Sequence, residues 1–327
     1  MQTTIIGALP KLPVRYEDAD NIRRALNAFE AGRIGVQALE TAQTGTQARA
    51  LAWQADAGID LAGDGQTRWQ DLLSPLCLDL AGMEAGGLIR FFNNNTYYRH
   101  PVIGGRIALE GRTLPGWFAE ARALAHGPLK ASLPGPFTIA RLSEDRHYHD
   151  LDGLLADLAE AVGLIASLLV RAGAAVVELE EPALSRERDA AARRQGLAAV
   201  RAAAAAAHTP VRLSLYFGDP APWLAELADL ALEGVSFDLV EAPSLGEVLA
   251  AETFPGRIGL GLVDARDLRL ESPQALAARL EPIARRQGDG RLLLHPNTAL
   301  EYLPSDGAVR KLALLSQTKR ALEGVCW

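Results

Sequence analysis

Cysteine is scarce in this chain: Cys77 and Cys326 are the only two among 327 residues, and they lie far apart. Two distant thiols cannot form a disulfide framework or a thiolate zinc cluster within one chain. We expect Cys77 to be a small core residue and Cys326 to lie at a frayed terminus.

Excess positive charge and long apolar runs are missing as well. The formal net charge is −7, whereas a nucleic-acid-binding surface needs clustered Lys and Arg. No basic segment followed by an apolar one opens the chain, and no apolar run approaches the roughly 20 residues that span a bilayer. The sequence therefore predicts a cytoplasmic protein that binds neither nucleic acid nor a membrane.

The chain instead contains short β-forming runs separated by segments with helical periodicity, a pattern typical of repeated βα units. Eight such runs in 327 residues favour an α/β fold of the (β/α)8 TIM-barrel type over an open sheet. Helices are expected between them, for example over 152–172 and 190–207. The predicted strands are Thr3–Ala8, Ile59–Asp64, Leu129–Pro134, Ala175–Glu181, Val211–Phe217, Val235–Val240, Ile258–Asp264 and Arg291–His295.

An extra segment lies between the second and third runs, over residues 88–108. Its β-forming residues flank turn-forming Asn and Gly, which predicts a β-hairpin inserted outside the ring. No domain boundary is visible, so we expect one barrel domain over residues 1–327. The hairpin could be a lid that brings Asn95 and Tyr98 over a site, or a polar turn that shields the barrel edge.

Five segments in order along the chain resemble the cobalamin-independent methionine synthase family, in particular its short, single-barrel members. The resemblance extends from Ile5 to about Leu312. It implies a TIM barrel that transfers a methyl group to a small molecule, with a methylcorrinoid as a possible donor and a corrinoid protein as a possible partner. The five segments are Ile6-Gly-Ala-Leu-Pro-Lys11, residues 57–68, Leu133-Pro-Gly-Pro-Phe-Thr138, Glu180-Glu-Pro-Ala-Leu184 and the Asn-Asn-Thr-Tyr-Tyr-Arg segment at 94–99.

The departures from the family pattern are informative. By the resemblance, the positions of the family's catalytic zinc ligands fall on Ser214, Tyr216, Asp238 and Thr298. Zinc that activates a thiol needs sulfur or imidazole ligands to bind tightly, so we expect no zinc here. The family's amino-acid contacts are changed too, to Ala8, Gln66 and Glu180, which puts homocysteine in doubt as the substrate.

In a TIM barrel the chemistry lies where strands end and βα loops begin. Glu180 and Glu181 are adjacent and point to opposite faces of a strand, so one of them must enter the barrel, where burial raises its pKa and makes it a plausible acid or base. We expect Glu180 to have this functional role. Tyr216 could donate its phenol to a bound anion or merely fill the barrel mouth, and His295 could be catalytic or a core histidine. We predict four catalytic residues, Glu180, Tyr216, Asp238 and His295.

Further polar residues at strand ends and in the hairpin are substrate-binding candidates. Arg68 could face an anionic substrate or pair with a carboxylate, and Asp64 and Asp264 could simply cap helices. His147 and His149 have His-x-His spacing, but their loop favours a surface position. An iron or manganese site built from Glu180, Asp238 and His295 is an alternative to a metal-free site. The predicted substrate-binding residues are Gly7, Gln66, Arg68, Asn95, Tyr98, Asp219, Asn297 and Thr298.

Three functions remain open at this point. The first is a zinc-independent methyl or one-carbon transferase that acts on a small molecule other than homocysteine. The second is a non-catalytic barrel that binds a ligand or a corrinoid partner protein. The third is a barrel recruited to carbon–sulfur or carbon–carbon bond chemistry that uses its carboxylates.

Overall fold

The computed structural model describes residues 1–15, 17–18 and 21–324. Cys326 lies outside these residues. Cys77 is only partly buried against the edge of the core, rather than inside it as predicted, and burial together with Asp71 raises the pKa of its thiol to about 11.

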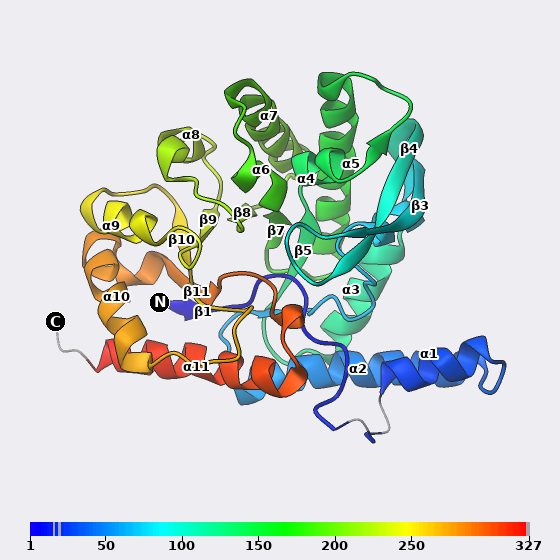
Figure 1. Cartoon of the computed structure of the whole chain (residues 1–327), viewed down its shortest axis with the longest axis horizontal. Coiled ribbons are helices and arrows are strands. Elements are labelled where there is room, and N and C mark those ends of the chain that lie inside the picture. The colour runs from blue at the N-terminus through cyan, green and yellow to red at the C-terminus, as the bar shows by residue number, and fades with distance from the viewer. Residues whose placement is uncertain (16, 19–20, 325–327) are drawn as a thin grey trace.

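Eight parallel strands form a ring, which confirms the predicted (β/α)8 barrel (Figure 1). Their spatial order is β1-β11-β10-β9-β8-β7-β5-β2. The two ends of this order meet because Thr4 and Leu61 form a parallel bridge, in which Leu61 N donates to Thr3 O at 3.0 Å. The strands are β1 Gln2–Thr3, β2 Ala62–Gly63, β5 Leu129–Pro134, β7 Val177–Glu180, β8 Val211–Leu215, β9 Gly234–Asp238, β10 Arg257–Val263 and β11 Leu292–Pro296.

The first two strands are shorter than predicted. Regular pairing of the first run stops near Thr4, and the chain then turns at Gly7, which has φ +48°. This left-handed conformation cannot continue a strand and favours glycine. Beside it, a Cβ at Gly63 would lie 2.9 Å from Ile5 Cδ1, so β2 packs closely on the β1 segment and ends there.

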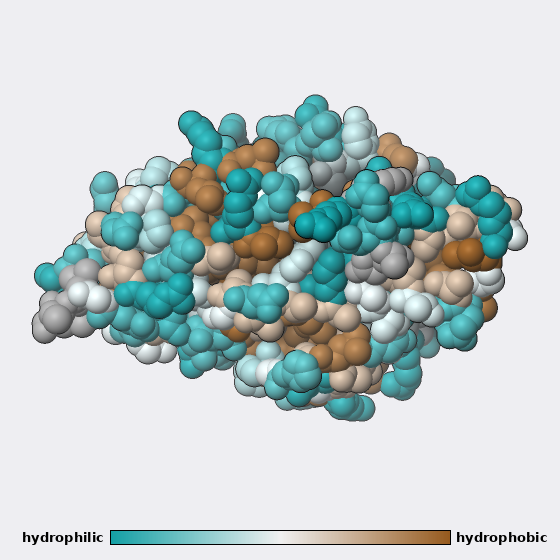
Figure 2. All heavy atoms as spheres, turned by 90° about the horizontal axis from the view of Figure 1, so that it is seen from below, coloured by the Kyte–Doolittle hydropathy of each residue, from teal (hydrophilic) through white to brown (hydrophobic). Residues whose placement is uncertain are grey.

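Helices surround the ring, and the two predicted in detail are present as α5 Leu151–Arg171 and α7 Ala190–Ala207. From the side of α2 and α11 the surface mixes hydrophilic and apolar side chains (Figure 2). The other α-helices are α1 Ile22–Glu30, α2 Val36–Asp56, α3 Thr113–Leu124, α4 Pro136–Arg141, α6 Pro182–Arg186, α8 Leu224–Ala228, α9 Pro243–Ala251, α10 Pro273–Gln287 and α11 Ser305–Glu323. Short 3-10 turns occupy Ser74–Leu78, Ala221–Trp223, Asp289–Arg291 and Leu300–Tyr302.

Helix α5 corrects the expectation that no apolar run in this chain approaches the length of a membrane-spanning helix. Its 21 residues are long and apolar enough to cross a membrane by length and composition alone, although Asp157 and Glu160 interrupt the apolar run. More than half of its most apolar window is buried inside the protein, where α5 packs against α7, α4 and β4. Core packing therefore accounts for its apolar face.

The inserted hairpin is longer than predicted, because its first strand begins at Leu80 rather than near residue 88. Strands β3 Leu80–Arg90 and β4 Tyr97–Leu109 pair in antiparallel fashion, and β6 Glu144–Asp145 adds a third strand. The register shifts near Gly82, whose φ is +75° and where a Cβ would lie 2.5 Å from Arg106 O. This bulge bends the hairpin.

One layer of side chains inside the barrel, that of Lys130 and Glu178, is polar. The layers of such barrels are usually formed by Val, Ile and Leu. Lys130 of β5 donates to Glu178 of β7 at 2.7 Å, and both side chains are fully buried. Burial lowers the pKa of Lys130, while Glu178 counteracts that effect. The two charges therefore compensate one another inside the ring.

We predict that Lys130→Met destabilises the protein by about 3–5 kcal/mol, because the substitution leaves the Glu178 carboxylate buried without its partner. The double variant Lys130→Met, Glu178→Leu should recover most of that loss, since it removes both charges. Urea denaturation followed by circular dichroism measures both. A Lys130→Met protein within about 1 kcal/mol of the parent would contradict the importance of this pair.

Candidate active site

A small cavity of about 30 Å³ lies where the barrel strands end, and we call it the Glu180 cavity. Such a volume holds about one water molecule. Its floor comes from the end of β7 and from the segments after β1, β2, β8 and β11, and its roof comes from the hairpin tip. The lining residues are Ala8, Gln66, Gln70, Asp71, Leu72, Phe91, Thr96, Tyr97, Tyr98, Glu180, Tyr216, Ala299, Glu301 and Tyr302.

Glu180 ends β7, and of the two adjacent carboxylates it is the one whose side chain enters the barrel mouth. The phenol of Tyr216 donates to Glu180 Oε2 at 2.9 Å, while Oε1 is buried with no hydrogen-bond partner among the described residues. Burial raises the pKa of Glu180 to about 8, against the opposing effect of the Tyr216 hydrogen bond. At neutral pH the carboxyl is therefore mostly protonated and can donate a proton.

Tyr216 follows the last residue of β8 and is almost fully buried. Burial, reinforced by the nearby charge of Glu180, raises the pKa of its phenol well above the ordinary value. The phenol thus keeps its proton and acts as a hydrogen-bond donor. The structure brings together these two of the four predicted catalytic residues.

Gly7, predicted as a substrate contact, lies against Glu180. A Cβ at this position would lie 2.9 Å from both carboxyl oxygens. Two features therefore require glycine at position 7: the positive φ of its backbone and the close approach of the Glu180 carboxyl group.

The adjacent Glu181 is buried on the other side of the strand. Its carboxylate accepts from Phe137 N at 2.9 Å and from Thr138 N and Oγ1 at 2.7 and 2.6 Å, at the start of α4. Burial raises its pKa to about 7. Glu181 therefore holds a helix start, and only Glu180 of the pair faces the cavity.

Asp238 does not line the cavity, although it was predicted to be catalytic. Its Oδ1 accepts from Val240 N, Glu241 N and Asn297 Nδ2 at 3.0 to 3.1 Å, and its Oδ2 accepts from Phe217 N at 3.2 Å. Burial raises the pKa of Asp238 despite these bonds. The carboxylate therefore ties together the loops after β8, β9 and β11.

His295, the fourth predicted catalytic residue, is a core histidine and does not line the cavity. Its Nδ1 lies 2.7 Å from Pro296 O, and burial lowers the pKa of the ring to about 4. The ring is consequently neutral at physiological pH, as the core interpretation of this residue expects.

The remaining predicted contacts divide into two groups. Gln66 and Tyr98 line the cavity; Gln66 donates to Ser132 O at 3.3 Å, and Tyr98 donates to Leu142 O at 3.3 Å. Five others lie outside the lining: Arg68, which pairs with Glu120; Asn95 and Asp219, which are exposed; and Asn297 and Thr298, which are buried. Asp64 and Asp264 accept from Gln66 N and Arg266 N, so they hold turns rather than helix starts.

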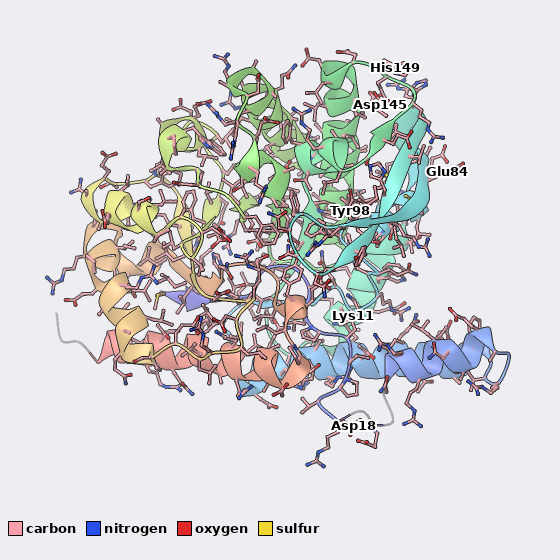
Figure 3. All side chains as sticks on the ribbon, viewed as in Figure 1. Lys11, Asp18, Glu84, Tyr98, Asp145 and His149 are labelled. Atoms are coloured by element: carbon pink, nitrogen blue, oxygen red, sulfur yellow. The ribbon has the colours of Figure 1, made fainter. Side chains whose placement is uncertain are left out.

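The hairpin forms the roof of the cavity through Phe91, Thr96, Tyr97 and Tyr98. In Figure 3, Tyr98 lies on the barrel side of the hairpin, whereas Asp145 and His149 lie at the periphery. His147 and His149 are exposed, as predicted. The roof rests on an aromatic cluster in which Phe91 contacts Tyr98 and Phe217 at ring distances of 5.8 and 6.4 Å. The hairpin tip therefore covers the cavity through these four residues, whereas Asn95 lies outside the lining.

Sequence reasoning missed several lining residues, notably Asp71, Phe91, Glu301 and Tyr302. Glu301 pairs with Lys11 at 3.1 Å. Glu301 and Tyr302 could have been predicted from their position shortly after the last strand, because lining residues are expected where strands end. Asp71 carries no such signal, because it reaches the cavity only through the fold of the segment before the hairpin.

The structure does not group Glu180, Asp238 and His295, the three residues of the iron or manganese hypothesis, around one point. Within residues 1–15, 17–18 and 21–324 there is no group of three or more His, Cys, Asp or Glu side chains placed to share a metal ion. The carboxylate of Asp238 is instead committed to backbone amides and Asn297.

Comparison with known proteins agrees with this architecture. The family described as "Cobalamin-independent synthase, Catalytic domain" matches residues 1–320. A methionine synthase of Saccharolobus islandicus is 26% identical over 316 residues, which cover 95% of this chain and 92% of that protein. One from Sulfurisphaera tokodaii is 25% identical over 320 residues, covering 95% and 89%.

Solved structures share the fold. A B12-independent methionine synthase from Shewanella sp. W3-18-1, in complex with selenomethionine, superposes with a TM-score of 0.84 at 18% identity, over 99% of this chain and 98% of that one. A putative vitamin-B12 independent methionine synthase from Listeria monocytogenes gives 0.75 at 16% identity, over 99% and 97%. At these identities the likeness concerns the fold.

The raised pKa of Glu180 predicts a pH-dependent stability. Its ordinary pKa is 4.5 and its folded pKa is about 8, so the folded state binds this proton more tightly. The stabilisation is complete below pH 4.5 and is lost as the pH rises through 8. Relative to Glu180→Gln, the parent should thus be less stable at pH 9 than at pH 5. Urea denaturation of both proteins at the two pH values tests this, and an equal difference at both would contradict it.

Proposed function

The chain belongs to the cobalamin-independent synthase family, and from that premise we propose that it is a zinc-independent methyl or one-carbon transferase. Its acceptor is a small molecule other than homocysteine. The observation that carries the proposal is the Glu180–Tyr216 pair, a buried proton donor and acceptor at the carboxyl ends of the strands. In this fold, active sites lie at that end of the barrel.

The residues at the family's zinc-ligand positions do not fit zinc. By the resemblance these are Ser214, Tyr216, Asp238 and Thr298, which offer three neutral hydroxyls, one carboxylate and no thiolate or imidazole. Zinc sites in proteins use Cys, His and carboxylate ligands. The Asp238 carboxylate accepts four hydrogen bonds, and the Tyr216 phenol is directed at Glu180. Both observations support a reaction without a zinc-bound thiolate.

Catalysis would then depend on positioning and on proton transfer. Protonated Glu180 can give its proton to the leaving atom of a methyl donor, and its ionised form can take the proton of an acceptor that attacks the methyl group. The Tyr216 phenol stabilises the ionised form by its hydrogen bond to Oε2. An unactivated thiol is a poor acceptor here, because little thiolate exists at neutral pH.

The cavity must open for any substrate to enter, since its present volume is only about 30 Å³. The hairpin roof is the segment suited to move, because its tip contributes Thr96 and the partly exposed Tyr97. Closure over a bound substrate would exclude water from the Glu180 carboxyl.

The test is a methyl-transfer assay on protein whose metal content has been measured and then removed with a chelator. Methylcobalamin and other methyl donors are combined with thiol, amine and hydroxyl acceptors, with homocysteine as the reference. We expect turnover to survive chelation and to fall roughly 10²–10⁴-fold in Glu180→Gln. Glu120→Gln, which alters only the exposed partner of Arg68, is the matched control.

Stoichiometric, tightly held zinc whose removal abolishes turnover would overturn the proposal. So would efficient methylation of homocysteine. Tight ligand binding without turnover for any donor and acceptor would favour a non-catalytic barrel instead.

A further inference from the structure

We propose that Asp71 is a positioning residue that latches a lid over the Glu180 cavity. The lid is the hairpin tip, residues 88–99, and its hinge is the Gly86–Gly87 pair of β3. The assignment rests on the proposed function for the identity of the site and goes further by naming the part of the site that moves. A cavity of about 30 Å³ has room for one water molecule, so it must open before a substrate enters.

The hairpin tip carries the whole roof of the cavity and is held together by its own hydrogen bonds. Phe91 N donates to Thr96 O at 2.8 Å, and Arg90 Nε donates to Asn94 O at 2.7 Å. The turn is thus closed from within, and the tip can move as one piece. Its lining residues are Phe91, Thr96, Tyr97 and Tyr98.

The base of the hairpin, residues 80–85 and 101–109, is anchored to the barrel wall. Strand β6 pairs with this part of β4, and helix α5 packs against β4. Ile107 N also donates to the phenol oxygen of Tyr148 at 2.7 Å. These contacts fix the base, so a movement of the whole hairpin would have to break them, whereas a movement of the tip would not.

A bulge separates the tip from the base. Ala85 pairs with Pro101, and Leu88 pairs with Arg99. Strand β3 therefore contains one residue more than β4 between these pairs, and the extra residue belongs to the Gly86–Gly87 pair. Pro101 has no N–H to give to the ladder, and a Cβ at Gly87 would meet no described atom within 4 Å. Two glycines with few contacts give the backbone the freedom that a hinge needs.

The Asp71 carboxylate connects the tip to the segment before the hairpin. Its Oδ1 accepts from Leu73 N and Ser74 N at 2.8 and 2.7 Å, and its Oδ2 accepts from Ser74 Oγ at 2.7 Å. Oδ2 also accepts from Arg99 N, in the tip, at 3.1 Å. The carboxylate is thus fixed from the barrel side and reaches the lid through one backbone amide. Hydrogen bonds to a charged acceptor are stronger than neutral ones.

Aromatic contacts keep the tip closed as well. The rings of Phe91 and Phe92 lie 6.4 and 5.6 Å from that of Phe217, and Tyr98 donates to Leu142 O at 3.3 Å. Phe91 and Tyr98 are almost fully buried. Opening exposes both side chains to water, so the open form is the minor one when no ligand is bound.

Hydrogen–deuterium exchange of the intact chain, followed by mass spectrometry without any substrate, locates the moving part. We expect amides of residues 88–99 to exchange at least about tenfold faster than those of the base, because exchange follows the local opening equilibrium. Equal protection of tip and base would overturn the proposed hinge.

A pair of variants at Arg99 tests the latch. Arg99→Pro removes the amide that Asp71 accepts and leaves the other bonds of Asp71 intact, whereas Arg99→Ala keeps the amide. Proline is tolerated here because this N–H is not used in pairing with β3. Relative to Arg99→Ala, Arg99→Pro should speed exchange of the tip roughly threefold to thirtyfold. Equal rates in the two variants would contradict the latch.

A pair of glycine variants tests the hinge. A Cβ would meet no described atom within 4 Å at Gly87 or at Gly104, which lies in the base. Gly87→Ala should slow exchange of the tip roughly twofold to fivefold, since alanine restricts the backbone of the open form. Gly104→Ala is the matched control and should leave the tip unchanged. The reverse pattern would place the hinge in the base.

Access to the cavity is the readout that a merely structural role of Asp71 would not move. In a chain with Cys77→Ser and Cys326→Ser, Ala8→Cys places a thiol in the lining. Methyl methanethiosulfonate should modify this thiol faster with Arg99→Pro than with Arg99→Ala, and more slowly with Gly87→Ala, by the same factors as the exchange. Thermal melting verifies that each variant folds.

Thiol modification that does not follow the exchange of the tip would show that the tip is not the gate. None of these measurements uses a methyl donor or acceptor, so the outcome is separable from that of the proposed function. An opening lid without methyl transfer counts against the function alone, and methyl transfer with an unmoving tip counts against this inference alone.

Discussion

The burial of one carboxyl group, that of Glu180, is the constraint around which the site is arranged. A carboxylate inside the barrel mouth costs free energy unless it is neutralised or hydrogen-bonded. Here the group meets both conditions, because its pKa rises to about 8 and Tyr216 donates to it. Gly7 must lack a side chain for this placement, since any Cβ would meet the carboxyl oxygens.

The rest of the barrel mouth encloses that carboxyl group. Asp238 fixes the loops after β8, β9 and β11 through four hydrogen bonds, and one of them reaches Phe217, whose φ is +67°. The strained backbone at Phe217 directs its ring against Phe91 and Tyr302, on which the hairpin roof rests. The Asp238 carboxylate thus has a structural task in this chain.

A polar interior continues below the site. The buried Lys130–Glu178 pair lies on the same inward face of the strands as Glu180, because residues two apart on a strand share a face. Both charges contribute to the pKa of Glu180, Glu178 by raising it and Lys130 by lowering it. The electrostatic environment of the site therefore depends on residues that no substrate touches.

The sequence by itself determined the barrel, the hairpin and the entry of one carboxyl group of the Glu180–Glu181 pair into the barrel. Strand and helix periodicities are local properties, and the alternation of side chains along a strand places one of Glu180 and Glu181 inside whatever their neighbours are. The tertiary structure decided which polar strand ends converge. Asp71, Glu180 and Glu301 are distant in sequence and meet only because the ring closes at Thr4 and Leu61. Likewise Asp238, His295 and Arg68 had suitable chemistry, but backbone amides, burial and Glu120 engaged them instead, and periodicity carries no information about such partners.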